Sequence, residues 1–310
     1  MIEPDNTIRF MDRHEIDVSK WDNCIHNAPN GLIYGRSFYL DSMAENWSGL
    51  VSGDYKNVMP LTWKKKFGIK YLYQPYFTKT LGVFGSSVHS FDISSFLNAV
   101  PAKFKYWDID LNENNFVSSK NKNLSQYART NYLLSLENDY EHINQQYKRL
   151  AKRMKKKAIK NNVEISPEVD PSAIIALYKR DYASSHRSIG NDIYEKLGRC
   201  TDIAFKNDLA DGYLARSTSG EILAYYLTLQ DDHSIYSLLG GSTETGRETG
   251  AFYLLTDSII RKHAGIKKTF RFEGSDIPGI SFFDRLFGPK KITYQHLIMN
   301  NLPFPIRFFK

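Results

Sequence analysis

The sequence predicts an α/β protein with mixed sheets, built from two related domains. The first observation is a strand–loop–helix–strand unit between residues 234 and 274. Two strands that are joined through a helix are expected to lie parallel in one sheet, with a right-handed crossover. The second observation is that the order of predicted elements in residues 7–136 recurs in the rest of the chain. The 310 residues are enough for two domains of ordinary size, so a duplicated unit accounts for the whole chain.

The first half predicts a strand, two helices, a three-strand meander, a helix and two further strands. Short runs rich in β-branched and aromatic residues indicate the strands, and apolar residues three or four positions apart indicate the helices. The strands are expected at 7–11, 47–52, 56–64, 69–73, 103–110 and 130–136. The helices are expected at 18–25, 36–45 and 91–98. Segment 74–85, with Pro75, Gly82 and Gly85, is expected to be irregular.

The second half repeats this order and opens with one long helix at residues 140–161. Its apolar residues recur at spacings of three and four and form one stripe: Ile143, Tyr147, Leu150, Met154 and Ala158. Strands are then expected at 163–165, 212–216, 221–229, 234–240, 269–273 and 291–298, and helices at 171–184, 191–207, 251–264 and 280–286. We therefore expect one domain at residues 1–139 and a second at 140–310, which would carry the donor site.

Composition limits the classes of function. Hydrophobic residues make up 42% of the chain and charged residues 24%, which is typical of a globular protein in water. No apolar run approaches the ~20 residues that cross a bilayer. The N-terminus lacks the basic and apolar segments of a secretory signal, so we expect a cytoplasmic protein. Cys24 and Cys200 lie far apart without cysteine neighbours, so we expect neither a zinc site nor a disulfide, and no metal cofactor.

The net charge of +7 is unevenly distributed. Residues 1–145 hold 15 Lys and Arg against 16 Asp and Glu, whereas residues 146–310 hold 26 against 18. Eight basic residues fall between Lys148 and Lys160. Such a run usually forms the solvated face of an amphipathic helix, and the alternative is contact with the phosphates of tRNA. Aromatic residues are not interleaved beyond Tyr147 and no base-reading motif is present, so the solvated face is the favoured interpretation.

The central unit predicts an anion site at its polar loop, residues 243–250. A loop at a helix N-terminus offers backbone N–H groups, and the helix dipole favours an anion there. Arg247 would supply a counter-charge. The residues expected to bind the donor are Gly240, Gly241, Ser242, Arg247, Thr249, Gly250 and Ala251. The alternative is a solvated loop in which Thr249 is an ordinary N-cap.

Glu273 is the candidate general base. Side chains alternate along residues 269–275, so that Arg271, Glu273 and Ser275 share one face of the strand. A carboxylate at the end of an interior strand is costly unless it is paired. One hypothesis is that Glu273 accepts a proton from an attacking amine while Ser275 orients it. The alternative, which is favoured, is a structural ion pair with Arg271 or another arginine.

Further residues are candidates for binding the substrate. Arg187 lies in a loop between two predicted helices, where it can grip a carboxylate or phosphate or simply lie on the surface. Tyr225 and Tyr236 are expected on adjacent strands, with Tyr236 as proton donor to the leaving group; the alternative places both in the core. The first-domain candidates lie in or beside the irregular, proline-containing stretch: Tyr73, Gln74, Tyr76 and Lys79.

Three stretches carry a resemblance to a known family. They are the basic helix and following strand at 147–165, the segment FEGSDIPGISFFDRLFG at 272–288, and QPY at 74–76 together with GVFGS at 82–86. Over most of its length the chain resembles the FemAB-like group of acyltransferases, and segment 272–288 is the most specific part of the match. The resemblance implies two tandem GNAT-like acyl-CoA N-acyltransferase domains.

The resemblance also implies an activity. Members transfer an acyl or aminoacyl group to an amine of a small molecule or peptide; Fem-type members use aminoacyl-tRNA, and others resemble acyl-CoA enzymes. The implied mechanism is direct attack in a cleft between the domains, with backbone N–H groups near Leu239 and Gly240 stabilising the oxyanion. This chain departs from both patterns, because Gly246 and Gly250 form only a loose glycine loop and no stretch is long enough for a helical arm. A non-catalytic binding protein with the same fold is the rival hypothesis.

Overall fold

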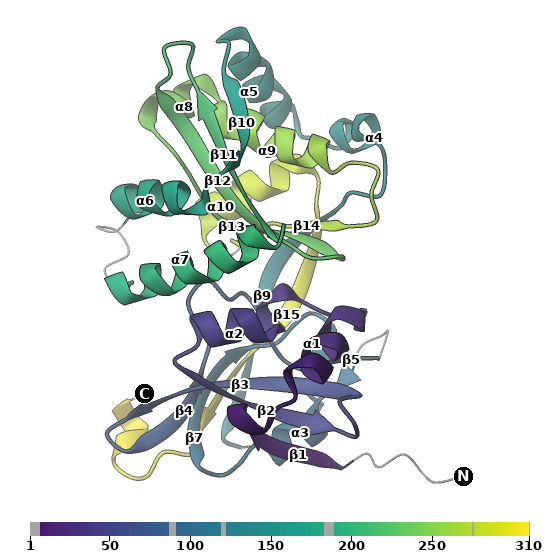
Figure 1. Ribbon diagram of the computed structural model, residues 1–310, viewed down its shortest axis with the longest axis vertical. Coiled ribbons are helices and arrows are strands. Elements are labelled where there is room, and N and C mark those ends of the chain that lie inside the picture. The colour runs from purple at the N-terminus through teal and green to yellow at the C-terminus, as the bar shows by residue number, and fades with distance from the viewer. Residues whose placement is uncertain (1–6, 87–90, 119–121, 183–188, 275, 310) are drawn as a thin grey trace. The chain divides into compact units, whose positions relative to one another are not determined.

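The computed structural model divides into two compact units. The structure describes residues 7–86, 91–118, 122–182, 189–274 and 276–309 (Figure 1). One unit comprises residues 1–129 with 293–310, and the other comprises residues 130–292. These units differ from the predicted ranges, 1–139 and 140–310, at two places. The reason is that β9 (Leu124–Ser135) and β15 (Lys290–Asn300) each begin in one unit and end in the other.

The first unit contains a mixed sheet with the strand order β1-β2-β3-β4-β7-β15. The strands are β1 (Ile8–Asp12), β2 (Asn46–Ser52), β3 (Asn57–Lys66), β4 (Ile69–Tyr73), β7 (Phe104–Asp110) and β15. Neighbours are antiparallel except β4 and β7, which are parallel. The short β5 (Phe84–Gly85) pairs with β3, and β6 (Phe91–Asp92) pairs with β8 (Asn115–Phe116). The parallel β4–β7 pair places the ends of these two strands, Tyr73 and Asp110, at one edge of the sheet.

Helices cover both faces of this sheet. They are α1 (Val18–Asn27), α2 (Ser37–Met43) and α3 (Ser94–Ala99), with 3-10 turns η1 (Arg13–Glu15), η2 (Ile33–Gly35) and η4 (Ile306–Phe309). Leu50 of β2 packs in one core with Phe96 of α3. The preceding residue, Gly49, faces α1, where a Cβ atom would lie 2.5 Å from the ring of Trp21. Adjacent residues of one strand therefore serve two cores, as the alternation of a strand requires.

The second unit contains a sheet with the order β9-β14-β13-β12-β11-β10. Its remaining strands are β10 (Glu164–Val169), β11 (Ala210–Arg216), β12 (Ile222–Gln230), β13 (Ser234–Ser242) and β14 (Thr269–Arg271). The pair β13–β14 is parallel, as the strand–helix–strand order predicts, and the other neighbours are antiparallel.

Helices also lie on both faces of the second sheet (Figure 1). They are α4 (Tyr140–Gln145), α5 (Arg149–Lys160), α6 (Pro171–Tyr182), α7 (Asn191–Lys206), α8 (Glu244–Thr249), α9 (Ala251–Lys262) and α10 (Pro278–Asp284), followed by η3 (Arg285–Phe287). On one face Tyr226 of β12 stacks on Phe252 of α9, with ring centroids 5.1 Å apart. On the other face the neighbouring Tyr225 reaches Asp181 of α6. This alternation fixes β12 and β13 between two layers of helices.

The predicted single helix at 140–161 is wrong, because the helix is interrupted between α4 and α5. Lys148 has an extended backbone, with φ −67° and ψ 155°. Its N–H donates to the carbonyl of Leu286 over 2.8 Å, rather than to a carbonyl in the preceding turn. The predicted apolar stripe nevertheless faces the core, because Ile143, Tyr147 and Ala158 are all buried there. A tertiary hydrogen bond thus overrides a continuous helical pattern.

Neither cysteine forms a disulfide in the described residues. Burial raises the pKa of the Cys24 thiol to about 11, so this thiol is protonated at neutral pH. Within the described part of the chain, no helix has the length and apolar composition that crossing a membrane requires.

His263 directly follows α9 and generates a prediction on stability. Burial, assisted by Lys262 and Lys268, lowers its pKa from 6.5 to about 4. Between these pH values the unfolded chain binds more protons at this position than the folded one, so the free energy of unfolding falls as pH falls from 6.5 towards 4. We expect His263→Gln to flatten this part of the profile, measured by urea unfolding at fixed ionic strength. A profile that keeps its slope would contradict the assignment.

Candidate functional site

The strands β13 and β14 begin as a parallel pair and then lose their pairing. Three residue pairs join them, and the last is Tyr236 with Arg271, whereas β13 continues to Ser242. On its other side β13 stays paired with β12, but the register shifts so that Leu238 forms a β-bulge. Beyond Tyr236, backbone groups of β13 that point towards β14 have no partner strand in the described residues. Such groups are available to a ligand, and bulges commonly re-aim a strand beside a site.

Gly240 and Gly241 belong to β13 rather than to a loop, and packing explains both. A Cβ atom on Gly241 would lie 2.3 Å from the hydroxyl oxygen of Tyr225. A Cβ atom on Gly240 would lie 2.9 Å from the ring of Phe252. The glycines therefore let two rings lie directly on the strand, one on each face. Leu239, between the bulge and these glycines, is buried.

The predicted polar loop at 243–250 is wrong, because these residues form helix α8. The side chain of Thr243 caps it by accepting from the N–H of Gly246 over 3.0 Å. The N–H groups of Arg247 and Gly250 donate to carbonyls within the same turn. Gly250 ends the helix with φ +83°, a conformation that favours glycine. A capping threonine and a terminal glycine at this spacing are the sequence signals that predict such a helix.

Several backbone donors of the segment predicted to hold a phosphate, those of Gly246, Arg247 and Gly250, are therefore already used. A Cβ atom on Gly250 would lie 2.5 Å from the carbonyl oxygen of Met154, so the start of α9 packs closely against α5. Ala251 is fully buried. The hydroxyl of Thr249 donates to the carbonyl of Thr245 over 2.9 Å, so Thr249 is not an N-cap. Arg247 is exposed and donates to the carbonyl of Ser242 over 2.9 Å, which leaves its charge near the end of β13.

A buried polar cluster stands where β13 and β14 separate. Arg271 Nε lies 3.1 Å from Glu273 Oε1, and the two side chains are only 5% and 6% exposed. The side-chain amide of Asn131, on β9, donates to Glu273 Oε2 over 2.8 Å. Its carbonyl oxygen accepts from the N–H of Glu273 over 3.1 Å. The ion pair with Arg271, the favoured alternative in the sequence analysis, is thus present.

The backbone of Glu273 is strained. Its φ is +62°, in the left-handed region that residues other than glycine rarely adopt. Such strain persists only where the surroundings hold it, and it is common at functional sites. A carboxylate has about four acceptor positions, and Arg271 and Asn131 use one on each oxygen. The carboxylate is thus held by a charged donor on one oxygen and an amide donor on the other.

The hydroxyls of two candidate tyrosines donate hydrogen bonds to partly buried carboxylates. Tyr236 is fully buried and its hydroxyl donates to Asp231 over 2.5 Å. Tyr225 is also fully buried and donates to Asp181 over 2.8 Å. Burial, followed by the hydrogen bond to Asp181, raises the pKa of Tyr225. Both therefore fit the alternative of core tyrosines. Two further candidates, Arg187 and Ser275, lie outside the described residues.

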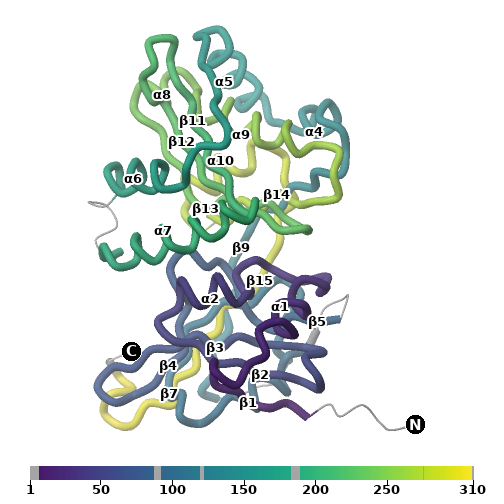
Figure 2. The backbone as a smooth tube through the Cα atoms, in the orientation of Figure 1, coloured from purple at the N-terminus to yellow at the C-terminus, as the bar shows by residue number. Residues whose placement is uncertain are grey.

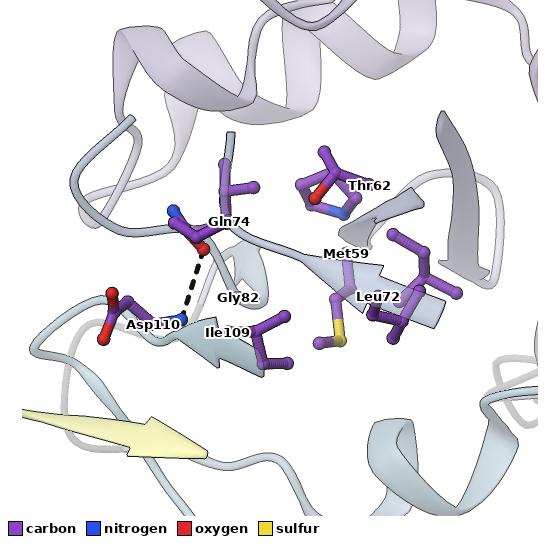
Figure 3. Close-up of a pocket in the computed structure, with 10 residues that line it drawn as sticks. Met59, Thr62, Leu72, Gln74, Gly82, Ile109 and Asp110 are labelled. Atoms are coloured by element: carbon purple, nitrogen blue, oxygen red, sulfur yellow. Dashed lines mark hydrogen bonds between the residues drawn. The ribbon is translucent and has the colours of Figure 1, made fainter. Parts of the chain in front are cut away.

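Gln74 of the first unit has a structural partner on each side of its amide, and Figure 3 shows the bond to Asp110. Its side-chain oxygen accepts from the N–H of Asp110 over 3.2 Å, and its nitrogen donates to the carbonyl of Thr78 over 3.1 Å. It also lines a small pocket with Thr62, Gly82 and other residues of β3, β4 and β7. Gln74 thus ties the irregular segment after β4 to the end of β7.

The other first-unit candidates have separate surroundings. The hydroxyl of Tyr73 accepts from the N–H of Glu45, and burial raises its pKa to about 12. Tyr76 is exposed. The ammonium of Lys79 lies 5.3 Å from the ring centroid of Tyr294. A role in binding an acceptor stays a prediction for these three residues and for Gln74.

Sequence reasoning missed Asn131, Ser237 and Leu238. Asn131 is a fully buried polar residue in a strand, which is a detectable anomaly, but its partner Glu273 is 142 residues away. Ser237 accepts from the hydroxyl of Tyr226 over 2.8 Å beside the bulge. A bulge such as that at Leu238 has no sequence pattern of its own. In the ranges that the structure describes, no group of three or more His, Cys, Asp or Glu is placed to hold a metal ion.

Comparisons with known proteins bear on the fold. No protein-family model matches the chain, and no curated protein sequence matches it. Among solved structures, FemX aligns with 94% of this chain and 98% of its own, at 12% identity and a TM-score of 0.68. The chain has the fold of FemX. The predicted α/β class with two tandem GNAT-like domains is thereby confirmed as a fold.

Other structures with this FemX-like fold match more distantly. One is the C-terminal DUF2156 domain of a protein described as a lysylphosphatidylglycerol synthetase from Agrobacterium fabrum, at 10% identity, a TM-score of 0.54 and 94% of each chain. Another is L-PGS from Bacillus licheniformis, at 10% identity and a TM-score of 0.50, over 85% of this chain and 87% of that one. At such identities the likeness is one of fold.

The buried ion pair generates a prediction on stability. We expect Arg271→Met to lower the free energy of unfolding by about 3–5 kcal/mol, because it leaves the charge of Glu273 buried and unpaired. The double change Arg271→Met/Glu273→Gln should recover much of this loss, since neither charge remains. The exposed pair Lys206–Asp202 is a control, because Lys206→Met should cost less than about 1 kcal/mol. Additive effects of the two changes in chemical unfolding would contradict the coupling.

Proposed function

We propose that this protein transfers an acyl group, aminoacyl groups included, to an amine at the opening between β13 and β14. The observation that carries the proposal is the end of pairing at Tyr236–Arg271 beside the bulge at Leu238. In this proposal backbone N–H groups of β13 near Leu239 and Gly240 donate to the donor carbonyl and stabilise the oxyanion that forms on it. The FemX-like fold supports this class of reaction.

In the proposed reaction the amine nitrogen attacks the carbonyl carbon directly. The new C–N bond forms as the carbonyl becomes an oxyanion, and collapse of that intermediate breaks the bond to the leaving group. Glu273 accepts the hydrogen bond of the amine and then its proton. Arg271 and Asn131 hold the carboxylate in position. Tyr236 contributes its buried ring, whose centroid lies 5.9 Å from the guanidinium of Arg271.

Two donors are compatible with this chemistry. Acyl-CoA would have to place its phosphates near Arg247, because the backbone donors of α8 are largely used within the helix. Aminoacyl-tRNA is the second candidate, and the basic surface of α5 is compatible with it as well as with a solvated helix face. Six basic residues of this region are exposed: Lys148, Arg149, Arg153, Lys156, Lys157 and Lys160. A basic surface of this kind binds phosphates with an affinity that depends on salt.

Binding measurements separate the two donors. We expect saturable calorimetric binding of either acetyl-CoA and a longer acyl-CoA, or an aminoacyl-tRNA, at fixed moderate salt. Arg247→Ala should weaken the first, and Lys156→Ser/Lys157→Ser should weaken the second and lower its salt slope by about 2, or about 1 per lost phosphate contact. Arg247→Ala serves as the control for aminoacyl-tRNA binding, and Lys156→Ser/Lys157→Ser serves as the control for acyl-CoA binding. Failure of both ligands to bind would remove acyl transfer from either donor and favour the non-catalytic hypothesis.

Replacement of the candidate base tests catalysis once a donor binds. We expect Glu273→Gln to lower turnover by about 10²-fold or more, because a neutral amide cannot accept the amine proton. The dissociation constant of the donor should change little, and circular dichroism should report an unchanged fold. Wild-type protein that binds the donor without turnover over a panel of amines would contradict the enzymatic proposal. Full turnover in Glu273→Gln would remove Glu273 from the mechanism.

A further inference from the structure

Two exposed segments lie at the edge of the first unit's sheet where β3 ends and β4 and β7 begin. One is the two-residue turn Phe67–Gly68 between β3 and β4. The other is the tail that follows β15 and contains η4. The N–H of Asn301 donates to the carbonyl of Lys105 over 2.8 Å, which ties the tail to the start of β7. The start of β7 pairs in turn with the start of β4, next to the turn. Both backbone views accordingly place the tail and the turn at the same end of this unit (Figures 1 and 2).

The most exposed large apolar side chains of the described residues all lie at this edge. Phe67 is 91% exposed, Phe304 is 81% exposed and Phe308 is 72% exposed. Ile306, between the last two, is also exposed. Single apolar residues on a surface are ordinary, but three phenylalanines gathered at one edge indicate an interaction site.

Folding gives no reason for a phenylalanine at position 67. Phe67 has φ +49° and Gly68 has φ +79°, which is the geometry of a tight hairpin turn that favours Asn-Gly. A bulky residue at positive φ is strained. The ammonium of Lys66 lies 5.6 Å from the centroid of the Phe67 ring. The side chain is therefore held out to solvent at a conformational cost.

The same edge concentrates positive charge. Residues 63–70, 101–105 and 301–309 hold seven basic and no acidic residues: Lys64, Lys65, Lys66, Lys70, Lys103, Lys105 and Arg307. Lys64 lies 3.6 Å from Glu45 of another segment. Lys65 stands directly opposite Lys70 in the ladder, and like charges at such positions are destabilising. The strained aromatic and the opposed lysines are both compatible with an anionic partner.

We propose that this edge docks on the surface of an anionic phospholipid bilayer, with the three phenylalanines inserted at the level of the headgroups. Exposed aromatic residues among lysines are the combination that binds such a surface, through apolar burial and attraction to anionic lipid. A second copy of this chain is a poor occupant, because it would bring seven like charges against seven. The phenylalanines also project from a narrow turn, from the 3-10 turn η4 and from the segment before it, which suits a fluid surface better than a flat protein interface.

Flotation of the full chain with vesicles tests the proposal. We expect binding to phosphatidylcholine vesicles that contain phosphatidylglycerol, and at least about tenfold weaker binding to phosphatidylcholine alone, because several lysines each contribute. Phe67→Ser/Phe308→Ser should weaken binding by about 100-fold, or about tenfold per lost phenylalanine. Ile203→Ser, at an exposed position of α7, is the matched control and should leave binding unchanged.

Two double variants, each of which removes two lysines, distinguish this edge from the basic helix α5. Lys65→Ser/Lys66→Ser should weaken binding to the anionic vesicles, whereas Lys156→Ser/Lys157→Ser should not. The opposite result would place the membrane contact on α5 and overturn the proposal. Absence of binding to either vesicle would also overturn it, as would an oligomer in sedimentation that the aromatic changes dissociate while vesicle binding persists.

Phe67→Asn separates a docking role from a folding role. Asparagine tolerates positive φ and suits this turn, so we expect the variant to melt at a higher temperature than the wild type while its affinity for anionic vesicles falls about tenfold. A lower melting temperature, or an unchanged affinity, would show that Phe67 serves the fold rather than the membrane.

Discussion

The buried ion pair of Arg271 and Glu273 determines how the central strands of the second unit end. Asn131 of β9 both donates to the carboxylate and accepts from the backbone of Glu273, so side chain and main chain are held together. This arrangement keeps Glu273 in a left-handed conformation that terminates β14 as a strand. Because β14 stops there while β13 continues, the sheet opens where the proposed chemistry needs exposed backbone donors. The buried ion pair and Asn131 thus determine where the sheet opens.

Ring packing supports the same opening from both faces. Tyr225 and Phe252 lie on consecutive glycines of β13, and each ring belongs to a different layer. The carboxylate of Asp181 fixes Tyr225, and Tyr226 stacks on Phe252. The end of β13 is consequently packed on both faces, although no strand of the described residues pairs with it on the side of β14. Preorganised donors of this kind need no rearrangement when charge develops on a carbonyl.

The sequence predicts local structure well and long-range structure poorly. Strand β4 begins and ends as its apolar pattern indicates, and the parallel β13–β14 pair follows from the strand–helix–strand order. The break before α5 depends on a hydrogen bond from Lys148 to Leu286, which no local pattern encodes. Of the candidate site, the pairing of Glu273 with Arg271 is predictable because the two are close in sequence. Asn131 and the bulge at Leu238 are not, because they depend on strand pairing and register.

The exchange of β9 and β15 between the two units affects the order in which the chain can fold. The first unit lacks β15, the strand that pairs with β7, until residues 293–300 have been synthesised. During translation the whole second unit is synthesised before β15. Until then one side of β7 lacks the strand with which it pairs in the folded protein. An unpaired strand edge invites wrong pairing. The second unit is one uninterrupted segment, 130–292, whereas the first is completed only by residues that follow it, so in biosynthesis the first unit cannot be treated as an independent domain.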